Sequence, residues 1–475
     1  MARDKMKKTK IVCTIGPASD SEEMLKKLIK AGMNVMRCNF SHGDYDEHTA
    51  KMNKLRNVNK ELGTNVAIML DTKGPEIRTG AFEGGFTEFK KGQVSVITPE
   101  EIVGTADRFT VSYKELYKDV KPGGFILVND GQVALLVDHV EGNEIYTVAA
   151  NDGRVKNTRG INVPGAILAF DFLSEKDKSD IKFGCEQNVD YIAASFVRRP
   201  QDVLDIKKLL CECGKPDIKI FSKIESVEAV ENLAEIVEVS DGIMVARGDL
   251  GVEVPAEDVP GIQKKLIKMC NAAGKPVITA TQMLESMQEN PRPTRAEVSD
   301  VANAIYDGTD AIMLSGESAQ GKYPEEAVMT MNKIALKAES QLDYGHLLRR
   351  AIRTSDDNTS EAICMSVAQI ATNFNVSAII AFTETGGTAN RMSRYKPECP
   401  IIAATPYEKT VRKLAISWGV KPVLVNEMKS KEGLVNLANV VAKENGIAAG
   451  EKVLVTGGTP GVVGQTNYLE LITVK

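Results

Sequence analysis

Eight short apolar runs recur along the first 350 residues of this 475-residue chain, and each is followed by polar residues and then by a helical pattern. The runs are nearly continuous stretches of Val, Ile, Ala and Met, as is typical of parallel strands buried on both faces. They occupy residues 11–15, 34–39, 66–71, 191–197, 218–224, 242–246, 276–280 and 311–314. Eight strands that alternate with helices predict an α/β fold, a (β/α)8 TIM barrel.

Helix-start signals between the runs support this prediction. Ser174 and Thr294 each precede an acidic residue by three positions, which is the spacing of a capping box. Ser226 precedes an amphipathic stretch that extends to Val239. We therefore expect helices to begin at these three capping residues.

The spacing of the runs is broken once. Successive runs start about 23 to 35 residues apart, but about 125 residues separate the third from the fourth, against roughly 30 for one βαβ unit. Short β-branched runs fill the gap, at residues 93–98, 125–129, 133–137 and 145–149. We expect a small β domain inserted after the third barrel strand, over residues 72–170. The loops there lie on the catalytic face of a barrel, where the insertion could act as a lid.

A second α/β pattern begins after a charged, polar stretch at residues 349–360. Its predicted strands are residues 378–382, 401–404, 423–425, 453–456 and 469–474. We therefore predict a separate C-terminal α/β domain over residues 349–475, which leaves residues 1–71 and 171–348 for the barrel.

The composition excludes several classes of protein. With 64 acidic and 59 basic side chains, a formal charge of −5, we expect no nucleic-acid partner and no membrane partner. The eight cysteines form no CxxC pair, which is typical of reduced thiols and predicts a cytoplasmic protein. We see no signal-peptide pattern and no apolar run of roughly 18 residues. The four histidines are too dispersed for a histidine metal cluster, so we expect any metal to be a hard cation bound by oxygen.

Charged and polar residues stand where the predicted strands end. Since strand residues two apart point the same way, the side chains at three of these ends should share a face. They are Arg37, Asn39 and Ser41 after the second strand, Lys223 and Glu225 at the fifth, and Arg247 and Asp249 at the sixth. The third strand leads into a charged turn at residues 71–79. All four groups lie at carboxyl ends of strands, where the catalytic groups of a barrel lie.

These residue types suit phosphoryl transfer. Glu225 and Asp249, from neighbouring strands, can hold Mg²⁺, and Arg37 and Arg78 can bind phosphate oxygens in a bidentate manner. Lys223 can place a positive charge where an oxyanion develops. A single strand-end Lys-x-Glu is more often an ion pair, but four such groups on one rim favour an active site.

A second phosphate motif is rejected. Residues 316–322 match the GxxxxGK pattern of a phosphate-binding loop. Tyr323 stands where that motif requires Ser or Thr for magnesium, and Pro324 follows. We therefore interpret the segment as a turn into the eighth barrel helix.

Six motifs resemble those of the pyruvate kinase family. They are Met36-Arg-Cys-Asn-Phe-Ser-His-Gly43, Asp71-Thr-Lys-Gly-Pro-Glu-Ile-Arg78, Ser222-Lys-Ile-Glu225, Arg247-Gly-Asp-Leu-Gly251, Thr279-Ala-Thr-Gln-Met-Leu-Glu285 and Met313-Leu-Ser-Gly-Glu317. The resemblance extends from residue 10 to the C-terminus. It implies an enzyme that transfers the phosphoryl group of phosphoenolpyruvate to ADP, giving pyruvate and ATP in glycolysis.

The resemblance also implies roles for single residues. Glu225 and Asp249 would bind Mg²⁺ or Mn²⁺, and Lys223 would stabilise the charge shared between the phosphoryl group and the enolate oxygen. The implied catalytic residues are Lys223, Thr281 and Arg37, and the implied substrate-binding residues are Arg37, Lys223, Gly248, Asp249 and Thr281. Arg37 would hold the phosphoryl group, and Thr281 would help to arrange protonation of the enolate carbon.

A K⁺ site is implied in the same way. Asn39, Ser41, Asp71 and Thr72 would coordinate K⁺ with side-chain and backbone oxygens. Glu76 is similar to the K⁺-dependent members, which have Glu at this position, whereas relatives with Lys there supply the positive charge themselves. We therefore expect activation by K⁺.

The residues implied for ADP and ATP binding are Asn39, His42, Arg78 and Arg159. Arg159 departs from the family pattern, which more often has Lys before the following glycine. A role for Arg159 in binding ADP remains an expectation.

In the C-terminal domain, residues 383–388 resemble the loop that binds the phosphate of an effector. The implied effector-binding residues are Thr383, Thr385, Gly386, Gly387 and Thr388. Gly387 stands where many relatives have a basic residue, and a helix start at Thr388 would favour an anion. With residues 457–464 as the facing loop, we expect a sugar-phosphate effector, with two ordinary Gly-rich turns as the alternative. Family members are usually homotetramers, and we expect the same here.

Two other functions compete with the kinase. A class I aldolase would use Lys223 as a Schiff-base nucleophile, but a lysine beside a magnesium carboxylate should stay charged. A phosphosugar-sensing scaffold without catalysis is the non-enzyme alternative. The intact set of Lys223, Glu225, Asp249 and Thr281 argues against it.

Overall fold

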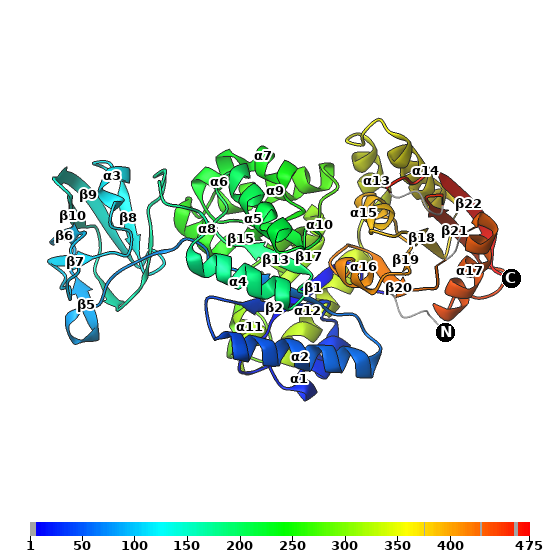
Figure 1. The fold of residues 1–475 in the computed structure, drawn as a ribbon, viewed down its shortest axis with the longest axis horizontal. Helices are drawn as coiled ribbons and strands as arrows, with labels where there is room; N and C mark the ends of the chain where they lie inside the picture. The colour runs from blue at the N-terminus through cyan, green and yellow to red at the C-terminus, as the bar shows by residue number, and fades with distance from the viewer. Residues whose placement is uncertain (1–5, 375, 428–429, 460–463) are drawn as a thin grey trace.

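The eight predicted strands close into one parallel barrel (Figure 1), which confirms the predicted TIM barrel. The computed structural model describes residues 6–374, 376–427, 430–459 and 464–475. The barrel strands are β1 (Lys10–Thr14), β2 (Val35–Asn39), β3 (Ala67–Asp71), β13 (Tyr191–Ala194), β14 (Lys219–Ile224), β15 (Gly242–Ala246), β16 (Val277–Ala280) and β17 (Ala311–Leu314). They pair in chain order, and β17 pairs with β1 to close the barrel.

The helices of the barrel begin where the capping residues predict. Ser174 and Thr294 form capping boxes, and Ser226 caps a helix through Ala229 N. The stretch after Ser226 is not one helix, because it is divided at Asn232, whose side chain donates to Arg198 O at 3.0 Å. These helices are α1 (Glu22–Ala31), α2 (Tyr45–Leu62), α4 (Glu175–Glu186), α5 (Pro200–Glu212), α6 (Val227–Glu231), α7 (Leu233–Val239), α8 (Arg247–Glu253), α9 (Val259–Ala272), η2 (Glu285–Gln288), α10 (Arg295–Asp307), α11 (Gly316–Ala319) and α12 (Pro324–Glu339).

The predicted β insertion between β3 and β13 forms the separate lobe at the left of Figure 1. Seven of its strands make one sheet in the order β4-β12-β8-β9-β10-β6-β7, and β5 and β11 make a second. Its own core includes Phe82, Phe89 and Phe109. The elements are β4 (Ile77–Arg78), η1 (Glu83–Gly85), β5 (Phe86–Phe89), β6 (Val94–Thr98), β7 (Arg108–Thr110), α3 (Leu116–Asp119), β8 (Phe125–Val128), β9 (Val133–Glu141), β10 (Glu144–Ala149), β11 (Gly153–Lys156) and β12 (Gly160–Asn162).

The C-terminal lobe, at the right of Figure 1, is the predicted α/β domain with a sheet of order β20-β19-β18-β21-β22. Strand β20 begins three residues earlier than predicted. Its start was not predicted because Lys421 and Pro422 interrupt the apolar run. As an edge strand it tolerates a proline. The elements are α13 (Tyr344–Ile352), α14 (Thr359–Asn373), β18 (Ala378–Phe382), α15 (Gly387–Arg394), β19 (Ile401–Thr405), α16 (Glu408–Lys413), β20 (Val420–Leu424), α17 (Lys431–Glu444), β21 (Lys452–Gly457) and β22 (Tyr468–Thr473).

The C-terminal domain closes the amino-terminal end of the barrel. Ala415 and Ile416, just after α16, share a buried cluster with side chains inside the barrel. Arg412 donates from Nε to Asp190 Oδ1 at 3.0 Å, and its carbonyl accepts from the Tyr191 hydroxyl at 3.1 Å. The carboxyl-terminal end of the barrel, where catalytic groups are expected, is thus the one that faces the inserted domain.

In the described part of the chain, no helix combines the length and the apolar character that crossing a bilayer requires.

Candidate active site

Lys223 lies at the centre of a buried charged cluster at the carboxyl end of the barrel. Its Nζ is 2.8 Å from Glu225 Oε1 and 3.4 Å from Asp71 Oδ1, and it donates to Ser195 Oγ at 2.7 Å. Burial alone would lower the pKa of Lys223, but the carboxylates of Asp71, Glu225 and Asp249 outweigh burial and raise that pKa. Lys223 is therefore held as an ammonium ion.

Arg37 joins the same cluster through Asp71. Its Nε is 2.6 Å from Asp71 Oδ2, and its Nη1 donates to Thr14 Oγ1 at 2.9 Å. Burial would raise the pKa of Asp71, but Arg37 and Lys223 outweigh it and hold that pKa below its ordinary value. Asp71 is thus an ionised bridge that fixes two cations from strands β2 and β14 beside each other.

Glu225 has a different partner for each of its carboxylate oxygens. Its Oε2 accepts from Phe196 N at 2.6 Å, while its buried Oε1 lies 2.8 Å from the Lys223 ammonium. Burial, reinforced by the charge of Asp249, raises the pKa of Glu225 to about 8. A buried carboxylate of this kind is stabilised by a cation.

The donor set fits a hard divalent metal ion. Glu225 and Asp249 offer only carboxylate oxygens, the ligands that Mg²⁺ and Mn²⁺ prefer. Among the described residues no group of three or more His, Cys, Asp or Glu could hold a metal. A metal here would therefore have two protein carboxylates and take its remaining oxygens from substrate and water.

Thr281 follows β16 in a backbone conformation that β-branched residues rarely adopt. Its φ is +66°, and that of Gln282 is +51°, which stores strain of a kind that clusters at functional sites. The Thr281 hydroxyl accepts from Gly248 N at 2.8 Å and donates to Ala280 O at 2.6 Å. Thr281 and the start of α8, which carries Asp249, are thus joined directly.

The expectation that Arg247 and Asp249 share one strand face is wrong. Strand β15 ends at Ala246, and Arg247 is the first residue of helix α8, where residues two apart do not face the same side. Arg247 instead pairs with Asp300 at 2.7 Å and donates from Nη2 to Thr281 O at 2.6 Å. Arg247 therefore supports the strained Thr281 backbone.

The residues expected to bind K⁺ lie at the adjoining ends of β2 and β3. Asn39 is paired in register with Asp71, and its Oδ1 accepts from Ser41 N at 3.1 Å. Thr72 O accepts from the Ser195 hydroxyl at 2.6 Å. The structure brings Asn39, Asp71 and Thr72 together beside the charged cluster, whereas Ser41 lies in an exposed turn.

The residues expected to bind nucleotide divide between two lobes. Asn39 and the exposed His42 belong to the barrel, and His42 O accepts from His48 Nε2 at 2.9 Å. Arg78 and Arg159 belong to the inserted domain. Arg78 Nη2 is 2.7 Å from Glu76 Oε2. The side chain of Arg159 is exposed.

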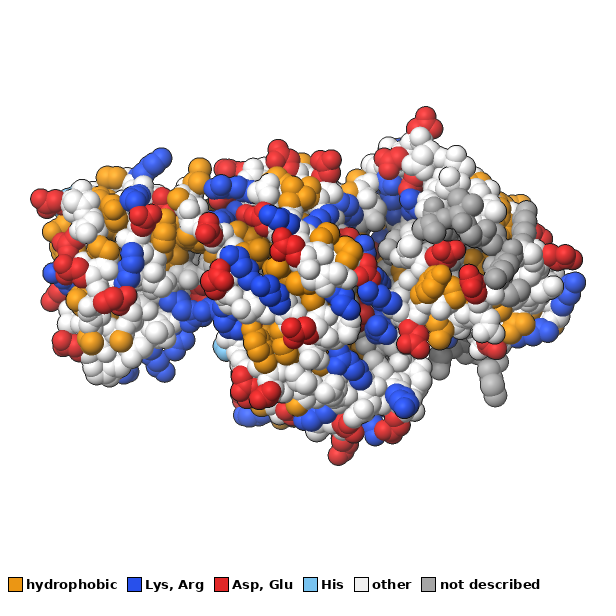
Figure 2. All heavy atoms as spheres, in the orientation of Figure 1, with side chains coloured by type: hydrophobic (Ala, Val, Ile, Leu, Met, Phe, Trp, Pro, Cys, Tyr) orange, Lys and Arg blue, Asp and Glu red, His pale blue; other side chains and the backbone are white. Residues whose placement is uncertain are grey.

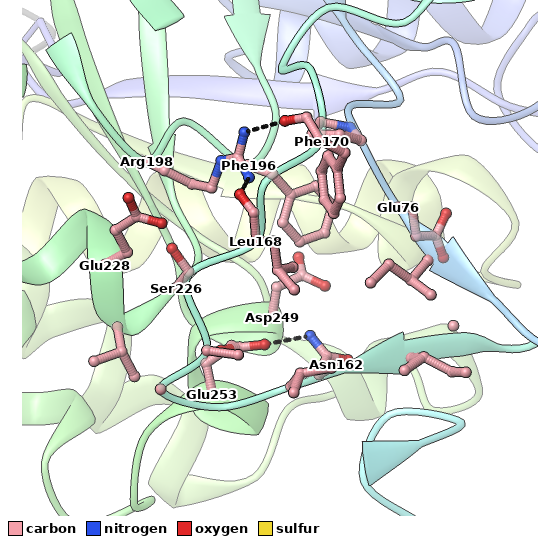
Figure 3. A pocket seen from close by; sticks show the side chains of 18 of the residues that line it. Glu76, Asn162, Leu168, Phe170, Phe196, Arg198, Ser226, Glu228, Asp249 and Glu253 are labelled. Atoms are coloured by element: carbon pink, nitrogen blue, oxygen red, sulfur yellow. Dashed lines mark hydrogen bonds between the residues drawn. The ribbon is translucent and has the colours of Figure 1, made fainter. Parts of the chain in front are cut away.

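A cleft separates the barrel rim from the inserted domain and contains Asp249 in its lining (Figure 3). Three hydrogen bonds join the two lobes at this cleft. Asn162 Nδ2 donates to Glu253 Oε1 at 2.9 Å, and Arg198 donates to the carbonyls of Leu168 and Phe170 at 2.9 and 3.1 Å. Figure 3 shows Asn162 and Glu253 pointing toward each other from the two lobes.

Sequence reasoning missed Ser195 and Glu253. Ser195 lies in the run 191–197, all of which was expected to be strand, but β13 ends at Ala194. A polar residue inside an otherwise apolar run is the sequence signal that could have identified Ser195. No sequence signal identifies Glu253, because its partner Asn162 is 91 positions away.

The interpretation of the rejected phosphate motif as one turn is only partly right, because residues 316–319 form the short helix α11 and only residues 320–323 make the turn into α12. The backbone N–H groups of Gln320 and Gly321 both donate to Gly316 O, at 3.0 and 2.9 Å, and Lys322 N donates to Gln288 O at 2.8 Å. These three donors are therefore committed within the protein.

In the C-terminal domain, helix α15 begins at Gly387, one residue before the expected Thr388, after Gly386 with φ +93°. Thr388 is buried, and its hydroxyl bonds to Thr466 Oγ1 at 2.8 Å, so it does not face an incoming ligand. Thr383 Oγ1 accepts from Gly386 N at 3.0 Å, and Thr385 stands in the same turn. Of the expected facing loop, residues 460–463 lie outside the described residues.

The chain is similar to known proteins over nearly its whole length. Family models described as "Pyruvate kinase, barrel domain" and "Pyruvate kinase, alpha/beta domain" match residues 6–328 and 361–472. The chain is 52% identical over 471 residues to pyruvate kinase of Staphylococcus aureus strain USA300, covering 98% of this chain and 80% of that protein. A crystal structure of a pyruvate kinase from Cryptosporidium parvum superimposes with a TM-score of 0.95 at 39% identity, covering 99% of this chain and 96% of that one.

Proposed function

The chain belongs to the pyruvate kinase family, and on that premise we propose that it transfers the phosphoryl group of phosphoenolpyruvate to ADP, giving pyruvate and ATP in glycolysis. The observation that carries the proposal is the placement of the Lys223 ammonium between Asp71 and Glu225 at the carboxyl end of the barrel. This is where a dianionic substrate, a polyphosphate and a metal would have to meet.

Glu225 and Asp249 hold the divalent cation, Mg²⁺ or Mn²⁺. A cation held by these two carboxylates would supply positive charge that offsets the negative charge developing during transfer. Phe196 N fixes the carboxylate of Glu225 through Oε2, and the other oxygen, Oε1, lies 2.8 Å from Lys223 Nζ, so a bound cation would share this carboxylate with the ammonium. Glu225 and Asp249 alone would repel an anionic substrate, and so the nearby cations Arg37 and Lys223 are needed as well.

Arg37 and Lys223 act on the transferring group. The P–O bond to the enolate oxygen breaks while a new bond forms to a terminal oxygen of ADP. Arg37 binds the phosphoryl oxygens, and Lys223 stabilises the negative charge shared between this group and the enolate oxygen. Both side chains are pre-oriented by Asp71, so little reorganisation is required.

Thr281 and Gly248 act on the pyruvate portion. Gly248 and Asp249, at the start of α8, bind the substrate beside Thr281. The Thr281 hydroxyl, already bonded to Gly248 N, helps to arrange protonation of the enolate carbon. The support of its backbone by Arg247 keeps the hydroxyl in place.

Oxygens of Asn39, Asp71 and Thr72, with Ser41 from the adjoining exposed turn, would hold K⁺. Glu76 lines the cleft and pairs with Arg78, so its negative charge is partly offset within the protein. A monovalent cation held there would contribute the positive charge that a lysine at this position would supply.

ADP is bound between the lobes, by Asn39 and His42 of the barrel and by Arg78 and Arg159 of the inserted domain. Closure of the inserted domain (residues 72–170) over the barrel excludes water and limits hydrolysis.

The C-terminal domain (residues 349–475) is the regulatory part. A sugar phosphate binds at Thr383, Thr385, Gly386 and Gly387, with Thr388 supporting the loop from inside. The chain acts as a cytoplasmic homotetramer.

The aldolase alternative is disfavoured by the surroundings of Lys223, because three carboxylates keep it protonated and hence not nucleophilic. Pyruvate formation from phosphoenolpyruvate and ADP, assayed with and without Mg²⁺ and K⁺, tests the proposal. Borohydride trapping of a Lys223–substrate adduct would instead support the aldolase, and the absence of any turnover would support a sensor.

A further inference from the structure

A cavity lies at the junction of the barrel and the C-terminal domain, apart from the catalytic rim. It has a volume of about 180 Å³ and is bounded by α9, the end of α10, α13 and the residues at the end of α15. Its polar lining residues include Lys268, Asn271, Arg350, Thr354, Arg394 and Lys396, and none of its lining residues is Asp or Glu. Figure 2 shows Lys and Arg side chains along the seam between the central lobe and the C-terminal lobe.

Two of the four cations hold the domains together. Arg394 Nη2 donates to Ala272 O of the barrel at 2.6 Å and also to Thr354 O, while its Nη1 is 3.3 Å from Glu361 Oε2. Its buried Nε has no hydrogen-bond partner among the described residues. Lys396 forms a buried ion pair with Asp310 of the barrel.

The other two cations are not neutralised. Lys268 and Arg350 both line the cavity, and within the described residues neither forms an ion pair or a side-chain hydrogen bond. Glu361 pairs with both Arg394 and Arg391, and Asp310 pairs with Lys396, so neither carboxylate neutralises Lys268 or Arg350 and the cavity keeps an excess of positive charge. Lys268 is exposed and Arg350 is half-buried, and both line this partly enclosed cavity, one from α9 and one from α13, where two cations without ion pairs attract an anion.

We propose that this cavity is a binding site for a phosphate group, either free phosphate or the phosphoryl end of a small metabolite. Arginine and lysine donors in a partly enclosed site are the usual ligands of phosphate oxygens. The volume exceeds the roughly 150 Å³ that admits a benzene-sized molecule in an engineered cavity, so an organic portion fits as well.

This site is distinct from the loop at residues 383–388. That loop stands at the amino-terminal end of α15, whereas Arg394 is the last residue of the same helix. An anion in the junction cavity contacts the end of α9. Because α9 stands in the chain between α8, which carries Asp249, and β16, which precedes Thr281, occupancy is expected to alter activity as well as stability.

The test is equilibrium dialysis with radiolabelled inorganic phosphate, with glycerol 3-phosphate as competitor. The protein is the full chain, either unchanged or with both Lys268→Ala and Arg350→Ala. A matched control carries Lys265→Ala and Arg349→Ala, which remove the same charge from exposed positions of the same two helices. Circular dichroism establishes that all three are folded.

The proposal expects the cavity variant to bind phosphate at least about tenfold more weakly, while the control binds as the unchanged chain does. Tighter binding of glycerol 3-phosphate than of phosphate would identify a metabolite as the occupant, and the reverse would identify free phosphate. Equal binding by the cavity variant and the control would overturn the proposal. So would loss of binding in a Thr383→Ala, Thr385→Ala variant with retention in the cavity variant.

Discussion

Asn162, in the last strand of the inserted domain, donates from Nδ2 to Glu253 Oε1 at the end of barrel helix α8, at 2.9 Å. The same short helix carries Asp249 in its first turn. The position of the inserted domain is therefore linked by one hydrogen bond to the helix that presents a proposed metal ligand. Arg198 of the barrel donates hydrogen bonds to the carbonyls of Leu168 and Phe170, in the segment that leads from the inserted domain back to the barrel, and so supports the same arrangement.

Removing this contact is predicted to impair the enzyme while leaving its fold intact. Glu253→Ala is expected to lower kcat/KM for ADP by about three- to tenfold, the net value of one typical hydrogen bond. Glu253→Gln keeps an oxygen that can accept from Asn162 and is expected to restore most of the loss. Steady-state kinetics of these variants, of Asn162→Ala and of the double variant test this.

A merely structural role for Glu253 would give a different result. Alanine at either position would then lower stability without changing kcat/KM, and the two effects would add in the double variant. The account instead expects the double variant to resemble the single ones, because both remove the same bond.

Ser195 is predicted to matter although it has no direct part in the chemistry. It accepts from Lys223 Nζ at 2.7 Å and its hydroxyl lies 2.6 Å from Thr72 O, so it fixes the ammonium relative to the expected K⁺ site. Ser195→Ala is expected to lower kcat by about ten- to a hundredfold. Ser222→Ala is the control, since Ser222 is buried on the same barrel but bonds to Ser240. Equal effects of the two substitutions on kcat would contradict this role.

Much of the fold follows from the sequence because its strands are continuous and apolar. Strands β15 and β17 have the predicted bounds, and the other barrel strands are found within a few residues, because both faces of each are buried. The shortest strands of the inserted domain escaped prediction. The pair Ile77 and Arg78 is a strand only because residues 160–161, distant in the chain, bond to it, and two residues carry no periodicity.

The site was predictable where it depends on local spacing and not where it depends on distant partners. Lys223 and Glu225 meet because the two-residue repeat of a strand continues one position past β14. The same rule failed at Arg247, where the chain turns into a helix at once. The contacts of Ser195 with Lys223 and Thr72 required the closed barrel, since the partners come from three different strand ends.

Lys10 is predicted to make stability depend on pH. It is buried beneath the C-terminal domain and donates to Val420 O at 2.6 Å, and burial lowers its pKa to about 8. In the unfolded chain a lysine keeps its proton until about pH 10.4. Between pH 8 and about pH 10.4 the unfolded state therefore binds more protons than the folded state. Over this range Lys10 makes the free energy of unfolding rise with pH by up to about 1.4 kcal/mol per pH unit. Below pH 8 the contribution of Lys10 is constant.

Chemical denaturation at pH 8 and pH 9.5 checks this prediction. Relative to Lys10→Met, the unchanged chain should gain about 1–2 kcal/mol over this interval. Lys421→Met, at an exposed position of the neighbouring strand, should follow the unchanged chain. Parallel behaviour of all three proteins would show that Lys10 is not the source of the slope.

The most direct test of the central claim replaces the ammonium at the barrel mouth. Lys223→Met removes the charge between Asp71 and Glu225 with little change in length, whereas Lys219→Met changes a lysine at the other end of the same strand, paired with Asp241 at 2.9 Å. Pyruvate formation from phosphoenolpyruvate and ADP is measured with Mg²⁺ and K⁺ present. The account predicts that Lys223→Met abolishes turnover in a folded protein while Lys219→Met retains it, and turnover by Lys223→Met within about tenfold of the unchanged enzyme would contradict it.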